Sequence, residues 1–184
     1  MPSLILSSRS IDALPESLGP LDEIDWVPID LLATVLIELS FSLFQDPPAN
    51  SMRVFHVVNP HKTTWRALLP SIIRILDSIP SSSDGETNRS ANIETLPLRE
   101  WLHRLRSSSS VLTSTNTASE TIAETLERNP GLKLLGFYEG LVGGGNGLGK
   151  LDIKETVRWS KALREMERVR EGWVKGWVRG WTTG

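Results

Sequence analysis

The sequence contains no cysteine. This absence excludes disulfide bonds, thiolate metal sites and a cysteine nucleophile together. Disulfides belong mainly to secreted proteins, so we expect an intracellular, cytoplasmic protein. The start of the chain agrees with this expectation, because MPSLILSSRS has too short an apolar stretch for a secretory signal and no basic segment before it.

Histidine and tyrosine are scarce. The three histidines, His56, His61 and His103, have no spacing that would place two of them on one face as metal ligands, so no metal site is predicted. The single tyrosine, Tyr138, is followed four residues later by Val142, which excludes the Y-x-x-x-K pair of short-chain dehydrogenases. No G-x-S-x-G motif occurs, and no serine precedes a lysine by three residues, so these nucleophile motifs are missing as well.

No apolar run is long enough to cross a bilayer. The strongest one, Ile29–Phe44, is shorter than the roughly 20 residues that a spanning helix needs, and it contains Glu38. Apolar side chains cover nearly all of its faces, which predicts a buried helix with neighbours on several sides. Asp30, after Pro28, is expected to cap the start of this helix. We therefore expect no contact with a membrane.

The net charge of −2 gives no reason to expect a nucleic acid as partner. The charge is unevenly placed, because residues 1–50 hold eight carboxylates and only one cation, Arg9. The C-terminal helix is basic instead.

Several helices and two short strands are predicted, which gives a helix-dominated α/β fold. Val54–Asn59 is β-branched and apolar and ends at Asn-Pro, so it predicts a short buried strand, and IETLP at residues 93–97 predicts a second one. Thr63 or Thr64 is expected to cap a helix that runs to Ile79, with Pro70 at a kink or in its first turn, and Leu98, Trp101, Leu102 and Leu105 fall on one face of the next helix. Thr117 with Glu120 forms a capping box for a helix to Arg128, and Asn129–Pro130 precedes a helix over Leu132–Val142. Asp152 and Ser160 are expected to cap the two last helices.

Three polar or glycine-rich tracts, residues 81–92, 107–117 and 143–150, are predicted loops. The last one invites a phosphate-loop interpretation, because Gly144–Lys150 fits G-x-x-x-x-G-K. However, Leu151 stands where that motif needs a serine or threonine hydroxyl, and no clear strand precedes it. A flexible connector is therefore favoured, and a nucleotide-binding protein is the weaker alternative.

His61 is a candidate for facing a ligand. It lies just past the carboxyl end of the predicted strand Val54–Asn59, where ligands bind in open α/β sheets. From the residues alone we favour the alternative, a hydrogen bond from His61 that stabilises the loop. His56, inside the predicted strand, is expected to be a core histidine with a hydrogen-bond partner.

The C-terminal segment GWVKGWVRGW places Trp173, Trp177 and Trp181 four residues apart on one helical stripe. Between Lys161 and Trp181 six basic residues accompany three acidic ones, so the helix fits a membrane surface or a partner helix. The interpretation we favour is a last helix that closes the core, because tryptophan stripes at helical spacing are usually buried.

The chain resembles, from about Ile11 to Trp181, the C-terminal part of the thioester reductase domain of fungal adenylate-forming reductases and related nonribosomal peptide synthetase-like enzymes. The segments that carry this resemblance, in chain order, are IDALPESLGPLDEIDWVPIDLLA, VFHVVNPHKTTWRALLPSI, PLREWLHRLR, NPGLKLLGFYEGL and LDIKETVRWSKALRE. The pairing of DWVPID with VFHVVNPH is the most distinctive feature.

These reductases are extended short-chain dehydrogenases in which NADPH reduces an acyl thioester carried on a phosphopantetheine arm, releasing an aldehyde or alcohol. The resemblance therefore implies that DWVPIDLLA is a strand-to-helix joint with Trp26 and Asp30 as structural residues. It implies that Val54–Asn59 is a late strand of a Rossmann-like sheet. Asn59, Pro60 and His61 would then line the substrate channel.

The same resemblance implies one partial domain, in which residues 11–80 belong to the sheet and joint and residues 81–184 form a helical substrate lobe. The family's cofactor glycine turn and its Tyr-Lys pair lie in the N-terminal half, and neither motif occurs here. We therefore expect no catalytic residue, and no cofactor bound by this chain alone. The implied partners are the upstream reductase half or parent enzyme and a phosphopantetheine carrier domain. The alternative function is a non-enzymatic helical module that docks a partner through its tryptophan-rich helix.

Overall fold

The computed structural model describes residues 1–45, 52–79, 93–114, 126–127, 129–144, 149 and 151–183. Helices dominate it and strands are short, which confirms the predicted helix-dominated α/β class. The helices are α1 (Pro2–Ser10), α2 (Ile29–Gln45), α3 (Trp65–Asp77), α4 (Leu98–Ser114), α6 (Leu135–Val142), α7 (Lys154–Trp159), α8 (Lys161–Arg164) and α9 (Glu171–Thr183), with 3-10 turns η1 (Gly19–Leu21) and η2 (Pro130–Leu134). None of the helices in the described ranges is long and apolar enough to cross a membrane.

Two small sheets contain the described strands. Strand β1 (Ala13–Pro15) pairs in parallel with β4 (Glu94–Leu96), and β2 (Glu23–Ile24) pairs antiparallel with β3 (Thr63–Thr64). Strand β4 lies within IETLP, which confirms the second predicted strand.

The predicted strand Val54–Asn59 is wrong for this structure, because the segment has no regular secondary structure. Val54 is also exposed rather than buried. A strand needs a neighbour that satisfies its backbone N–H and C=O groups. Across the described ranges no segment pairs with residues 54–58.

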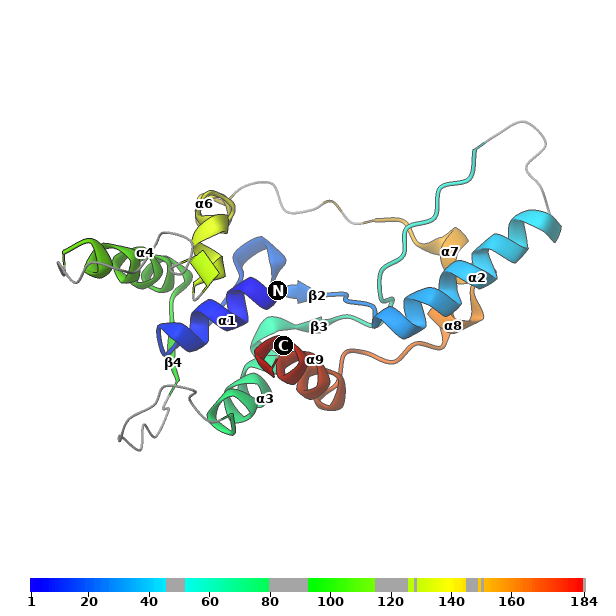
Figure 1. Cartoon of the computed structure of the whole chain (residues 1–184). Coiled ribbons are helices and arrows are strands. Elements are labelled where there is room, and N and C mark those ends of the chain that lie inside the picture. Colours follow the sequence, from blue (N-terminus) through cyan, green and yellow to red (C-terminus); the bar gives the residue numbers. More distant parts are fainter. Residues whose placement is uncertain are drawn as a thin grey trace.

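The larger hydrophobic cluster surrounds the β1–β4 pair and is covered by α1, α3, α4, α6 and α9 (Figure 1). Two fully buried tryptophans anchor it. The Trp65 indole donates a 2.7 Å hydrogen bond to the carbonyl of Pro15. The Trp101 indole donates to the Ser8 hydroxyl and to the Ala13 carbonyl, both at 3.0 Å. Both indoles therefore bind backbone carbonyls of β1, Trp65 at its last residue and Trp101 at its first.

The smaller cluster forms where α2 packs on α7 and α8, away from the sheets at one end of the molecule (Figure 1). Val35 and Leu39 of α2 are buried there against Leu163 and Met166. Glu38 joins the helices by accepting hydrogen bonds from the Ser160 hydroxyl (2.6 Å) and the Ala162 N–H (3.0 Å). Its carboxylate thus supports the cap of α8 from a neighbouring helix.

Helix α2 forms where it was predicted, but two details of that prediction are wrong. The helix is buried on one side only, since Val35, Leu39 and Ser42 are its buried residues. The opposite side is exposed, because α7 and α8 cover only one face of α2. Full burial of a helix that is apolar on nearly all sides would need further neighbours. Asp30 lies in the first turn instead of at the cap, because the helix starts at Ile29 and the Pro28 carbonyl already accepts from the Leu32 N–H.

The other predicted helix signals have mixed outcomes. Thr64 caps α3, with its hydroxyl accepting from the Ala67 N–H at 3.2 Å, and Pro70 lies inside the helix. The residues predicted to form the α4 face, Leu98, Trp101, Leu102 and Leu105, are all buried. Helix α4 continues through Ser114, so the predicted break at residue 107 is wrong, because serine is only mildly unfavourable within a helix.

The C-terminal part contains three helices where two were predicted. Ser160 caps α8 as expected. Ile153 holds the cap position of α7, while the Asp152 carboxylate accepts from the Lys154 N–H at 3.0 Å. Asn129 precedes η2, but its side chain makes no capping hydrogen bond.

Some predictions fall outside the described residues. These are the loop at 81–92, the capping box of Thr117 with Glu120, and most of the glycine tract at 143–150.

Candidate functional site

The loop Asn59–Pro60–His61 is held in place by the Asn59 side chain, which is fully buried. The Asn59 Nδ2 donates to the Trp26 carbonyl at 3.3 Å and to the Glu167 carbonyl at 2.9 Å. Its Oδ1 accepts from the His61 N–H at 2.9 Å, and its own backbone N–H donates to the Asp25 carbonyl at 2.8 Å. Asn59 therefore connects three segments that lie far apart in the sequence.

The two other candidate residues are more accessible. Pro60 is half-buried and His61 is exposed. The hydrogen bond that stabilises this loop at His61 comes from its backbone N–H, which leaves the imidazole in solvent. Next to it, Lys62 forms an ion pair with Glu23 at 2.9 Å. The loop thus presents the imidazole ring of His61 on a fixed backbone, while Asn59 is buried beneath it.

The resemblance predicts that Trp26 is a structural residue. It is half-buried, and its ring centroid lies 6.0 Å from that of Trp177, with the planes tilted by 59°. Trp177 in turn lies 6.3 Å from Trp173. Because the Trp26 carbonyl accepts from Asn59, this aromatic group adjoins the anchored loop.

Helix α9 closes the larger cluster. Val174 and Val178 are buried, and the tryptophan stripe is half-buried against the same cluster. The helix packs mainly on α3 and is joined to it by an ion pair between Arg74 and Glu171. This packing favours the interpretation of α9 as a core helix over a freely exposed docking stripe.

Tyr138 is buried against Trp101, edge to face, with ring centroids 5.2 Å apart. Burial raises the pKa of its phenol to about 12, because desolvation disfavours the charged phenolate. A catalytic tyrosine paired with a lysine needs the opposite shift, toward the working pH. The environment of Tyr138 is therefore that of a core residue.

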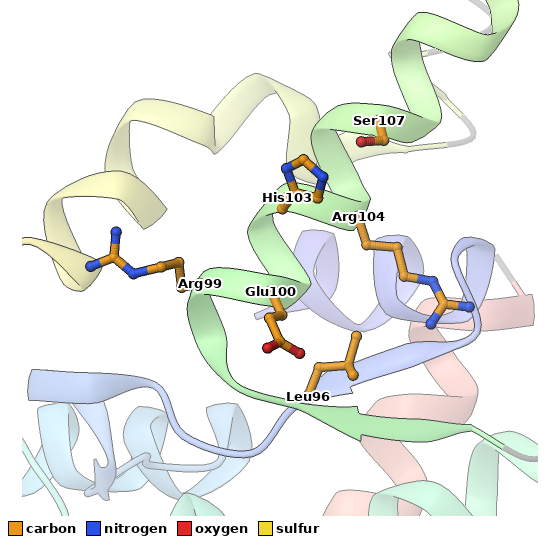
Figure 2. A pocket seen from close by; sticks show the side chains of 6 residues that line it. All are labelled: Leu96, Arg99, Glu100, His103, Arg104 and Ser107. Carbon is orange, nitrogen blue, oxygen red and sulfur yellow. The ribbon is translucent and has the colours of Figure 1, made fainter.

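A shallow hollow lies along the exposed side of α4 (Figure 2). Its lining residues are Leu96, Arg99, Glu100, His103, Arg104 and Ser107. The side chains of Arg99 and Arg104 extend in opposite directions in Figure 2, and Arg104 is paired with Glu94 at 2.9 Å. These charged groups do not converge on a common point, so the hollow has no arrangement for binding an anion.

The described residues do not fit a dinucleotide or a metal. None of the described α-helices opens on the glycine-rich turn after a strand that holds a pyrophosphate in Rossmann folds. No group of three histidine or acidic side chains that could hold a metal ion occurs in the part of the chain that the structure describes. The strand on which the prediction for His61 rested does not form, so the fixed backbone of the loop is the feature that keeps it as a candidate site.

A further apolar surface is the exposed side of α2. Leu36, Ile37, Ser40, Phe41 and Phe44 line a shallow hollow there. The signal for it was present in the sequence, because the helix is apolar on nearly every side.

Comparison with known proteins found relatives much longer than this chain, and no family model matches it. The chain is 34% identical over 172 residues to a carboxylic acid reductase of Neurospora crassa, a match that covers 92% of this chain and 14% of that protein, in its C-terminal part. It is 25% identical over 138 residues to an adenylate-forming reductase of Heterobasidion annosum, covering 75% of this chain and 10% of the relative. It is 27% identical over 179 residues to a non-reducing polyketide synthase of Aspergillus terreus, a match that covers 94% of this chain and 6% of the relative.

Proposed function

We propose that this chain, a homologue of the C-terminal part of fungal carboxylic acid reductases and adenylate-forming reductases, is the substrate lobe of an NADPH-dependent thioester reductase. The observation that carries the proposal is the 34% identity across 92% of the chain. The proposed enzyme is of the extended short-chain dehydrogenase type and releases a carrier-bound acyl chain as aldehyde or alcohol. Its partners are the rest of the reductase and a phosphopantetheine carrier domain, and we place it in the cytoplasm.

The proposed role of this chain is to shape the acyl site while the rest of the enzyme binds NADPH. The chain spans 14% of the length of the carboxylic acid reductase that it matches, so most of such an enzyme lies in other segments. NADPH, when bound there, supplies the hydride. Tyr138 is not a candidate for the proton donor, because its buried phenol has a raised pKa and no lysine follows it at the required spacing.

The anchored loop is the part of the chain proposed to meet the acyl thioester. The Asn59 side chain fixes the backbone of His61 through a 2.9 Å hydrogen bond, and Pro60 between them has a fixed φ angle. A substrate contact on such a loop costs little ordering entropy, because the backbone is already fixed. His61 can then hydrogen-bond a polar group of the acyl-pantetheine.

The test uses a chimeric reductase, defined as the Neurospora crassa carboxylic acid reductase with its matching segment replaced by this chain. His61→Ala in the chimeric reductase should raise KM for an acyl-pantetheine thioester about fivefold, the loss of one hydrogen bond of roughly 1 kcal/mol, with kcat within about twofold. His103→Ala is the matched control, because that histidine is also exposed but lies on α4. The role of His61 would be rejected if KM stayed unchanged, or if kcat fell at constant KM.

A further inference from the structure

The exposed side of α2 carries a run of residues with the spacing of a helix-pairing seam. Ile29, Ala33, Leu36, Ser40 and Leu43 follow one another at intervals of four, three, four and three residues, and all are exposed. That alternation is the pattern of residues that meet a second helix along its length. We call these five residues, with their neighbours Ile37, Phe41 and Phe44, the α2 seam.

The hollow on this side has the geometry of a site for a side chain from another helix. Ile37, Ser40, Phe41 and Phe44 stand at positions i, i+3, i+4 and i+7, and all four line it. Four residues at this spacing form the hole that accepts one side chain in knobs-into-holes packing. The small Ser40 lies between larger apolar side chains, which gives the hole its depth.

The α2 seam also lacks the polar features that oppose association. None of its eight residues is charged. The Ser40 hydroxyl donates a 2.8 Å hydrogen bond to the Leu36 carbonyl in its own helix, so burial of this residue leaves its donor satisfied. The charge that α2 carries on this side is Asp30, which is exposed in its first turn, and antiparallel pairing would keep the two copies of Asp30 at opposite ends of the interface.

The exposed apolar area is large enough for a dimer. Phe41 is 62% exposed and Phe44 is 82% exposed, so at 150–250 Å² for each aromatic side chain they leave on the order of 300 Å² open. Ile29, Leu36, Ile37 and Leu43 are between 39% and 78% exposed and add a comparable area. If the partner covered all of it, two copies would bury at most roughly 1,200 Å² in total, at the lower end of specific interfaces.

We propose that two copies of this chain associate through their α2 seams, each helix supplying knobs and holes to the other. Helix α2 lies at one end of the molecule, with α7 and α8 on its opposite side (Figure 1). The symmetric pairing therefore requires no rearrangement of the described core. The proposal is independent of the proposed enzymatic function.

The test is sedimentation equilibrium of the purified chain with two variants. The unmodified chain should be a dimer at micromolar concentration, and Ile37→Glu should weaken the dimer at least about a hundredfold, because it buries like charges opposite each other. Leu151→Glu is the matched control, since Leu151 is an exposed apolar residue outside α2, and it should leave the dimer unchanged. Circular dichroism should show that both variants keep their helices, because both positions are exposed.

Two results would overturn the proposal. The first is a monomer across the whole concentration range. The second is a dimer that Ile37→Glu does not weaken. If the chain is monomeric and Ile37→Glu instead lowers the melting temperature of the chimeric reductase, the rest of the reductase covers the α2 seam. Aldehyde formation by the chimeric reductase separates either failure from failure of the proposed function.

Discussion

Asn59→Ala tests the role of the buried asparagine that anchors the candidate loop. The substitution removes two donated hydrogen bonds, to the carbonyls of Trp26 and Glu167, and the acceptor for the His61 N–H. The alanine methyl group cannot replace any of them. The connection before α2 and the connection before α9 then lose their common contact, because Trp26 and Glu167 meet through this side chain.

The expected loss of stability follows from these three bonds. Each hydrogen bond contributes about 1 kcal/mol net, and a buried polar group left without a partner costs about 1–3 kcal/mol. The bond to Trp26 is long at 3.3 Å and adds little, and the freed groups are only partly buried, so water can reach some of them. We expect the free energy of unfolding to fall by about 2–4 kcal/mol, which lowers the melting temperature by roughly 5–15 °C for a chain of this size.

Urea unfolding followed by tryptophan fluorescence measures this loss, since the chain contains seven tryptophans. His61→Ala is the control, because its imidazole is exposed and should change stability by less than about 0.5 kcal/mol. Asn59→Asp keeps the acceptor for His61 but turns oxygen toward two carbonyls, so it should destabilise at least as much as alanine. A loss below about 1 kcal/mol for Asn59→Ala would show that the loop is held by other contacts.

Two further predictions concern the larger cluster. Trp177→Ala should lower the free energy of unfolding by about 2–3 kcal/mol, which is less than the roughly 3–5 kcal/mol for a fully buried aromatic, because this ring is half-buried. Thermal unfolding measures the loss, and an unchanged melting temperature would contradict the assignment of α9 to the core. Burial raises the pKa of Tyr138 from its unfolded value of 10 to about 12. The stability that the neutral phenol contributes is therefore intact below pH 10 and should be lost as the pH rises toward about 12, at up to roughly 1.4 kcal/mol per pH unit. Urea unfolding across this range should show that the free energy of unfolding falls more steeply for the unmodified chain than for Tyr138→Phe, and equal slopes would contradict the burial argument.

The sequence predicted best those elements whose signals are local. The α4 face appears as expected, because the periodicity of Leu98–Leu105 needs no distant partner. Strand β4 also forms within IETLP as predicted, and there β1 from the start of the chain supplies the partner. Residues 54–58 have an equally clear strand pattern but form no strand, since pairing depends on a neighbour that the pattern does not contain. For helix α2 the apolar pattern predicted the extent of the helix, but it did not predict how many of its sides other elements cover.

The candidate site was predictable only in outline. The position of His61 after an apolar run drew attention to the loop Asn59–His61. The role of Asn59 was not predictable, because its partners Trp26 and Glu167 lie 33 and 108 residues away along the chain. Such contacts depend on how the β2–α2 connection and the α8–α9 connection approach each other, which no local pattern encodes.

Aldehyde formation from an acyl-pantetheine thioester and NADPH, measured for the chimeric reductase and for the isolated chain side by side, tests the central claim most directly. The account predicts that the chimeric reductase forms aldehyde, whereas the same reductase lacking the segment and the isolated chain do not. A well-folded chimeric reductase without activity would contradict the assignment as a substrate lobe. Aldehyde formation by the isolated chain, with NADPH bound at micromolar concentration, would contradict it from the other side and would mean that a complete active site lies within these 184 residues.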